Sequence, residues 1–418
     1  MKLGGRIQSR GMALALLSGI NTLNYVDRYV GAAVLPLMLA AFALSDAKGG
    51  LLQSAFILTY SLVSPAAGWL GDRQRRLPLA AAGVLLWSLA TVASGLAPTY
   101  ALLLIARGLI GVGEASYSVI TPSLLSDYYP PERRARALAV FYAAIPVGSA
   151  LGYIVGGSIG THFGWRQAFF VAGIPGAALA LALLLLTEPE RGIHDRQPAG
   201  TALDLGLAPT VRELVRRRSY VYNTVAQILY TFAMGGLATW MPTYFVRVRG
   251  LSLEQATSTF GAILVVAGFA GTLFGGHLSD RLEGRLRAAA FAVSGAGLCA
   301  SLVFTALAVL HPDPRVFWPA MFLTLLLLFL NTGPLNAALA NVLPATLRGR
   351  GFAVTTMLIH LLGDAASPWL IGVASDRFGL TLPVMATGAM LAVAGVVLLA
   401  GRSALERDRA AMSAGAAS

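Results

Sequence analysis

The sequence predicts an all-α membrane protein in which twelve transmembrane helices form two pseudo-symmetric six-helix bundles. Hydrophobic residues make up 56% of the 418 positions and charged residues only 12%, whereas a soluble domain has about 25% charged residues. The apolar residues gather in stretches long enough to cross a bilayer, and a weak repeat relates the two halves of the chain. Because lipid offers the backbone no hydrogen bonds, such stretches cross it as helices.

Each predicted span is an apolar stretch of about 20 residues or more, the length that a helix needs to cross a bilayer. The first stretch contains Asp27 and Arg28 and lacks a small-residue cleavage site. We therefore interpret it as a retained span and not as a signal peptide. The twelve predicted spans are residues 12–37, 49–71, 78–97, 100–124, 135–160, 166–187, 219–245, 255–279, 286–310, 316–341, 350–374 and 380–401.

The distribution of basic residues between alternate loops predicts the orientation. The loops on the side of the termini hold 23 Lys and Arg residues and the opposite loops hold six. Basic loops stay in the cytoplasm, so both termini should face it. The net charge of +12 is explained by these loops, and we expect no nucleic-acid partner. Short loops and a preference for Arg over Lys are typical of bacteria, which predicts the bacterial inner membrane.

The longest connection divides the chain into three predicted parts. An N-terminal six-helix bundle covers residues 1–187, a cytoplasmic linker covers 188–218, and a C-terminal bundle with a short cytoplasmic tail covers 219–418. Within the linker, residues 210–218 (TVRELVRRR) could form a short basic helix that lies on the membrane surface.

Three motif pairs recur between the halves at nearly the same offset, 208 to 215 residues. The pairs are residues 68–73 with 276–281, 130–140 with 344–354, and 162–164 with 377–379. Each pair occupies the same place in its half, which is hard to obtain by chance. Two homologous bundles imply a pseudo-two-fold axis along the membrane normal and a substrate site between the halves.

Three charged residues lie at bilayer depth, where an ionised group is costly and marks a functional site by default. Asp27 and Arg28 lie in the first span and Glu114 in the fourth. At 1.5 Å per residue, Asp27 lies about 22 Å along the first span from its cytoplasmic end, and Glu114 lies about 21 Å along the fourth span from its outer end. Both are near the middle of a core about 30 Å thick.

The sequence contains no signature of an enzyme. The nucleotide-binding pattern Gly-x-x-x-x-Gly-Lys is missing, and we interpret residues 111–114 (GVGE) as packing inside the membrane. The single cysteine, Cys299, excludes an intramolecular disulfide and a zinc cluster. We therefore expect no cofactor and no metal, and a monomer. His360 and Asp364 lie four residues apart, which fits a metal pair, a proton relay or a structural hydrogen bond.

Several motifs resemble those of known transporters. Residues 68–76 (GWLGDRQRR) resemble the signature loop of the major facilitator superfamily, and the resemblance to that superfamily covers nearly the whole chain. Closer motifs in the first half resemble the Spinster family. They are NYVDRY (24–29), GLLQS (50–54), RGLIGVGEASYS (107–118) and FYAAIPVGSALGY (141–153).

Spinster proteins are proton-coupled lipid transporters associated with sphingosine 1-phosphate and lysophospholipids. The resemblance implies a proton-coupled secondary transporter of an amphipathic, anionic lipid that works by alternating access. It also implies that Asp27 and Glu114 couple transport to protons. Three alternatives remain at this point: an exporter of hydrophobic drugs, a carrier of small organic anions, and a membrane lipid sensor that does not transport.

Arg28 and Arg107 are the candidates for the anionic headgroup, since arginine binds phosphate in a bidentate manner. The alternative is a permanent structural ion pair of either arginine with Asp27 or Glu114. The other candidate substrate-binding residues are polar or aromatic side chains within the spans, namely Asn24, Tyr60, Tyr117, Tyr142, Tyr153 and Asn331.

Charged residues at the cytoplasmic ends of the second and eighth spans are candidates for a gate. Such a gate would pair with the other half when the cytoplasmic side is closed, and the alternative is that these charges only orient the protein. The candidates are Asp72, Arg73 and Arg76, with Asp280 and Arg281 in the second half.

Overall fold

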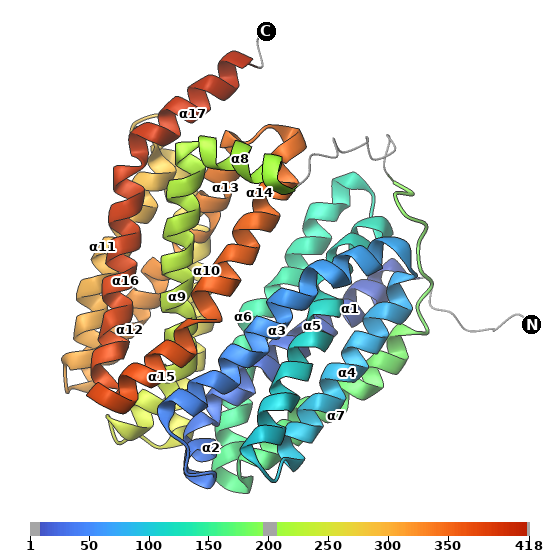
Figure 1. The fold of residues 1–418 in the computed structure, drawn as a ribbon, viewed down its shortest axis with the longest axis vertical. Helices are drawn as coiled ribbons and strands as arrows, with labels where there is room; N and C mark the ends of the chain where they lie inside the picture. Colours follow the sequence, from blue (N-terminus) through green and yellow to red (C-terminus); the bar gives the residue numbers. More distant parts are fainter. Residues whose placement is uncertain (1–8, 195–206, 416–418) are drawn as a thin grey trace, which may run out of the picture. The chain divides into compact units, whose positions relative to one another are not determined.

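The computed structural model describes residues 9–194 and 207–415, and these residues are mainly helical (Figure 1). The middle of the predicted linker, residues 195–206, and the basic residues Lys2, Arg6 and Arg196 lie outside the described part. By their contacts, residues 9–194 and 238–262 form one compact unit, and residues 207–237 and 263–415 form a second.

The first unit contains six long helices and one short one. Helix α1 packs against α6, α3 against α5, and α4 against both α5 and α7. The helices are α1 (Arg10–Ala33), α2 (Leu35–Ala41), α3 (Asp46–Arg73), α4 (Arg76–Leu96), α5 (Tyr100–Tyr128), α6 (Pro131–Phe163) and α7 (Trp165–Leu183). The ends of α9 and α10 between residues 238 and 262 belong to the same unit.

The second unit is centred on α11, which packs against α12 and α16. Its helices are α8 (Leu207–Arg216), α9 (Arg218–Arg247), α10 (Leu253–Leu282), α11 (Ala289–Leu310), α12 (Pro314–Phe329), α13 (Thr332–Val342), α14 (Ala345–Leu358), α15 (Ser367–Phe378), α16 (Thr381–Ala400) and α17 (Arg402–Gly415). A π-helical turn, Ile359–Asp364, connects α14 to α15.

Within the described residues, ten helices or pairs of continuous helices are long and apolar enough to cross a membrane. Helices α1 and α9 are 24 and 30 residues long but more polar, and with them the helices account for the twelve predicted spans. Three of the spans are not single α-helices. The first breaks at Val34, the tenth at Asn331, and the eleventh contains the π-helical turn.

The motif pairs detected in the sequence mark equivalent helix boundaries in the two units. Pro130 and Pro344 each immediately precede a helix, α6 and α14. Gly164 and Gly379 each immediately follow one, α6 and α15, with φ of 87° and 74°. Side chains other than glycine rarely adopt such angles, so both helices end at glycine for the same steric reason.

Candidate functional site

The charged residues at the middle of the first unit gather in one buried group, which we call the charge cluster: Asn24, Asp27, Arg28, Arg107 and Glu114. Helix α1 supplies the first three residues and α5 the other two. Asp27 and Glu114 are 0% exposed and Arg107 is 1% exposed. The four charges sum to zero, which lowers the cost of burying them.

Two glycines beside Glu114 let α5 lie close to its neighbours. A Cβ atom on Gly113 would lie 2.6 Å from the Gly83 carbonyl oxygen of α4, and one on Gly111 would overlap the Phe56 carbonyl of α3. Neither position can therefore hold a larger residue. The pattern Gly-x-Gly-Glu thus places a carboxylate between two closely packed helices.

Arg28 and Glu114 form an ion pair, with 2.8 Å between Nη2 and Oε2. The Arg28 guanidinium also lies over the rings of Tyr25, Phe56 and Tyr60, at 4.8, 5.1 and 5.1 Å from their centroids. These are cation–π distances. The Arg28 side chain keeps 16% exposure, so it is the member of the ion pair that a ligand can reach.

Asp27 lies beside this pair but has no ion-pair partner among the described residues. Its Oδ2 atom accepts a hydrogen bond from the Thr91 hydroxyl of α4 at 2.6 Å. Its Oδ1 atom, and both polar atoms of the Asn24 side chain, have no hydrogen-bond partner in the described part of the chain. Most buried polar atoms are hydrogen-bonded, so this side of the charge cluster is unsaturated.

Arg107 is likewise only partly satisfied. Its Nη2 atom donates to the Gln53 side-chain oxygen at 2.6 Å, while Nη1 has no partner among the residues described. Its guanidinium packs against Gly31, where a Cβ atom would lie 3.2 Å away. The charge cluster therefore contains one ion pair, in which Glu114 Oε1 and Arg28 Nε also have no partner among the described residues. Beside it lie an acid and an arginine that are not paired with each other.

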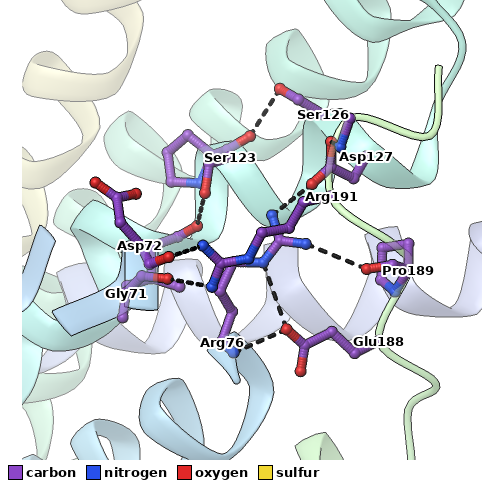
Figure 2. Close-up of polar contacts among 12 residues, drawn as sticks. Gly71, Asp72, Arg76, Ser123, Ser126, Asp127, Glu188, Pro189 and Arg191 are labelled. Atoms are coloured by element: carbon purple, nitrogen blue, oxygen red, sulfur yellow. Dashed lines mark hydrogen bonds and ion pairs between the residues drawn. The ribbon is translucent and has the colours of Figure 1, made fainter. Parts of the chain in front are cut away.

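We call the end of the first unit formed by the connections at residues 73–76, 129–131 and 188–194 the basic end. A second polar group lies there, around Arg76 (Figure 2). Arg76 is 4% exposed. Its Nη1 atom is 2.5 Å from Asp127 Oδ2, and its Nε atom is 3.5 Å from Glu188 Oε1. Glu188 also accepts the backbone N–H groups of Arg76 and Leu77 at 2.8 and 3.4 Å. It thus caps the N-terminus of α4, where a negative charge is stabilising.

Arg191 completes this group from the other side. Its guanidinium donates to the carbonyl oxygens of Gly71 and Gln74, at 2.7 and 2.5 Å, and to that of Asp72. These carbonyls lie at the C-terminus of α3, where a positive charge is favourable. The basic-end network, defined as Arg76, Asp127, Glu188 and Arg191, therefore fixes both helix ends that flank residues 74–75.

The family follows from comparison with known proteins. The Major Facilitator Superfamily model matches residues 17–368. Protein spinster homolog 1 of Bos taurus is 37% identical over 389 residues, which cover 88% of this chain and 73% of that protein. This chain belongs to the Spinster family of the major facilitator superfamily. It is an integral membrane transporter and not an enzyme, so the predicted fold class and family are confirmed.

Other Spinster relatives agree. A protein of Xenopus tropicalis named sphingosine-1-phosphate transporter SPNS2 is 35% identical over 380 residues, covering 87% of this chain and 73% of its own. The crystal structure of a bacterial homologue of the human lysosomal transporter Spinster, inward-facing and unoccupied, superposes with a TM-score of 0.87 at 25% identity. That match covers 96% of this chain and 98% of the other.

In this Spinster protein the predicted site tyrosines lie in different surroundings. Tyr60 lies over Arg28 in the charge cluster. Tyr117 is fully buried, donates to the Leu17 carbonyl at 2.5 Å and packs edge-on against Trp87. Its hydroxyl is thus already used within the helix packing.

The two tyrosines of α6 differ in exposure. Tyr142 is 47% exposed, whereas Tyr153 is 0% exposed. The Tyr153 hydroxyl donates to the Ala238 carbonyl, and its ring packs against Tyr29 and Phe260. Tyr142 is therefore the one of this pair that can contact a ligand without rearrangement.

The candidate residues Asn331, His360 and Asp364 of the second unit lie in two separate places. Asn331 is buried at the break between α12 and α13 and donates to the Leu328 carbonyl. His360 Nδ1 lies 3.0 Å from Asp364 Oδ2 within the π-helical turn. In the described part of the chain, no group of three or more His, Cys, Asp or Glu side chains could hold a metal ion.

The candidate gate residues also lie in different surroundings. Of the three in the first unit, only Arg76 has its side chain in the basic-end network. The Asp72 carboxylate is exposed and points away (Figure 2), and the Arg73 guanidinium lies over the Trp69 ring at 4.2 Å. Asp280 and Arg281 are exposed at the end of α10.

Sequence reasoning missed five polar residues of these two groups. Gln53 lies in a Spinster-like motif, yet nothing in the sequence linked it to Arg107. Thr91 gave no signal, because a threonine in an apolar span is common. Asp127 lies in α5, whereas Glu188 and Arg191 lie in the segment after α7, and only the tertiary structure reveals that these two segments meet.

Proposed function

We propose that this protein is a proton-coupled transporter of an amphipathic, anionic single-chain lipid of the lysophospholipid or sphingosine 1-phosphate type. The observation that carries the proposal is the charge cluster, in which one acid and one arginine are paired while another acid and another arginine are not. The lipid class is supported by the relative named as a sphingosine-1-phosphate transporter.

The incomplete pairing suggests how a proton could be coupled to a conformational change. A buried carboxylate that lacks a cation is costly, because burial favours the neutral form and a nearby cation favours the charged form. Protonation of Asp27 and an ion pair between Asp27 and Arg107 are thus alternative ways to stabilise the same group. Proton binding at Asp27 would favour the arrangement without the pair, and proton release the arrangement with it.

Glu114 takes the second proton-coupling role in this proposal. Its only ion-pair partner among the described residues is Arg28, so protonation of Glu114 would release the Arg28 guanidinium. The released guanidinium could then bind a phosphate headgroup by its two parallel N–H groups. Tyr60 and Asn24 stand beside it as further substrate contacts.

We also propose the topology that the loop charges predict, with both termini in the cytoplasm of a bacterial cell, a six-helix bundle on either side of residues 188–218, and a monomer as the working unit. The basic end would then be cytoplasmic, and the exposed Asp72, Arg73, Asp280 and Arg281 would be free to form a gate with other parts of the protein.

Uptake into liposomes tests the proposal. Purified protein would be assayed with sphingosine phosphate, lysophospholipids and small organic anions, with and without a pH difference across the membrane. We expect lipid uptake that the pH difference drives, and its loss in Asp27→Asn and in Glu114→Gln. Lipid uptake by both variants at the wild-type rate under the pH difference would refute the coupling. Uptake of organic anions without lipid uptake would refute the substrate class.

A further inference from the structure

Helix α8 has an unusual distribution of exposed and buried side chains. Thr210 and Leu214 are 2% and 1% exposed, whereas Val211 and Val215 are 38% and 57% exposed. Leu214 packs against Gly351 of α14, where a Cβ atom would lie 3.3 Å from it. One side of this short helix is thus packed on the second unit, while its valines are left uncovered.

The residues of α8 fall into four sectors around the helix axis. At about 100° per residue, Val211 and Val215 form one stripe, and Thr210 and Leu214 lie about 100° to one side of it. The exposed Arg212 and Arg216 lie about 100° to the other side, and Glu213 lies opposite the valines. If the valine stripe faces the membrane, the packed face and the arginines flank it and Glu213 points to water.

The packed sector holds α8 firmly in this orientation. Arg217, directly after the helix, donates to the Val342 carbonyl at 2.8 Å and lies 3.6 Å from Glu213. Arg350 of α14 lies 3.5 Å from the Thr210 hydroxyl. The valine stripe and the arginines are therefore presented by a fixed helix.

The position of α8 fits a membrane surface. Only one residue separates its end at Arg216 from the start of α9 at Arg218, so α8 lies at the level at which that span begins. Figure 1 shows α8 crosswise to α9. Apolar side chains on a surface helix with arginines beside them are typical of helices that lie in the lipid headgroup region.

We propose that α8 is an interfacial helix that inserts Val211 and Val215 into the bilayer surface and binds anionic lipid headgroups through Arg212 and Arg216. Charge complementarity favours an anionic bilayer surface as the partner of this face, because the exposed Arg212 and Arg216 lie directly beside the valine stripe. Anionic headgroups attract them, at about 1 kcal/mol per arginine.

Fluorescence quenching in vesicles tests the orientation. A fluorophore would be attached to Val215→Cys or Glu213→Cys in a Cys299→Ala background, with the full chain in phosphatidylcholine and phosphatidylglycerol. We expect quenching of the Val215 probe by phospholipids brominated on their acyl chains, and of the Glu213 probe by aqueous acrylamide. Acrylamide quenching at both positions would refute insertion. Weak quenching by both reagents at Val215 would instead show that protein covers this face.

The headgroup preference has its own test. Titrations with brominated phosphatidylglycerol and brominated phosphatidylcholine give the ratio of their affinities for the site beside the Val215 probe. This ratio should favour phosphatidylglycerol, and Arg212→Gln with Arg216→Gln should lower it by about fivefold for each arginine. The matched control, Arg285→Gln with Arg407→Gln, removes two exposed arginines from elsewhere in the second unit and should keep the ratio. An equal ratio in the α8 variant and the wild type would refute the role of the two arginines.

Discussion

Two acids and two arginines occur together at two places in the first unit. In the basic-end network, both arginines donate to several acceptors, and both acids accept backbone N–H groups as well as a guanidinium. In the charge cluster, one arginine and one acid are paired, and Asp27 and Arg107 each keep a polar atom without a partner among the described residues. The same four side-chain types are thus saturated in one place and unsaturated in the other.

The difference lies in what surrounds the charges. The basic end has free helix termini, whose N–H and C=O groups supply partners for charged side chains. The charge cluster lies in the middle of long helices, where the backbone is already hydrogen-bonded to itself. Charges at that depth can be satisfied only by other side chains, by protons or by ligands, and in the proposed mechanism they change between these partners. We expect the saturated group to stabilise and the unsaturated group to switch.

Removal of the central arginine of the saturated group should have the largest effect on stability. Arg76→Gln leaves Asp127 and Glu188 without their buried cation, and breaking a buried ion pair in this way costs about 3–5 kcal/mol. Arg73→Gln, three residues away and exposed, should cost less than about 0.5 kcal/mol. Unfolding of the two purified variants would be followed by thermal denaturation in detergent. Equal stabilities would contradict the contrast between these arginines.

One substitution made in both regions compares them directly. Asp127→Asn loses charge-assisted hydrogen bonds to Arg76 and to the Gly192 N–H and should cost about 3 kcal/mol. Asp27→Asn removes a charge that has no ion-pair partner and should change stability by less than about 1 kcal/mol while abolishing proton-driven uptake. Unfolding and liposome uptake would be measured for both. If Asp27→Asn unfolds the protein and Asp127→Asn does not, the two regions have been assigned the wrong roles.

Binding of an anionic lipid should depend on Arg28 through both its charge and its planar shape. Arg28→Ala should weaken binding about tenfold to a hundredfold, since a charge-assisted contact contributes about 1.5–3 kcal/mol. Arg28→Lys should recover only part of this, because lysine lacks the bidentate geometry. The affinities would be measured by titrating a series of lysolipids against wild type, Arg28→Ala and Arg28→Lys. If Arg28→Ala binds the lipid with wild-type affinity, Arg28 does not bind the headgroup, and Arg107 becomes the candidate.

The smallest effect in this series should come from Arg191. Arg191→Gln removes the cation that caps the C-terminus of α3, which should lower stability by about 1 kcal/mol. The C-terminal residues of α3 should then exchange their amide hydrogens faster, whereas those around the charge cluster should not. Hydrogen exchange followed by mass spectrometry resolves the two regions. Faster exchange throughout the first unit would show that Arg191 supports more than this helix end.

Much of the fold could be predicted because the lipid bilayer restricts the backbone that crosses it. Apolar stretches of about 20 residues cross lipid as helices, so the twelve spans were visible in the sequence and their loops appeared as basic or turn-forming segments. Pro130 and Gly164, with their counterparts Pro344 and Gly379, mark helix boundaries for steric reasons that act within a few residues. The breaks at Val34 and Asn331 have a signal of the same kind, because Pro36 and Pro334 lie in the first turns of α2 and α13, but it was not used to divide these spans.

The sequence by itself determined that Asp27, Arg28, Arg107 and Glu114 lie in spans, because a charge within an apolar stretch stands out wherever the helix packs. Which charges meet was decided only by the tertiary structure, since pairing depends on the rotation and contact of helices far apart in the chain. Arg28 pairs with Glu114 across 86 positions of sequence. Arg107 instead meets Gln53, and Asp27 meets Thr91. Polar side chains such as Gln53 and Thr91 acquire a role only when packing places a charge beside them.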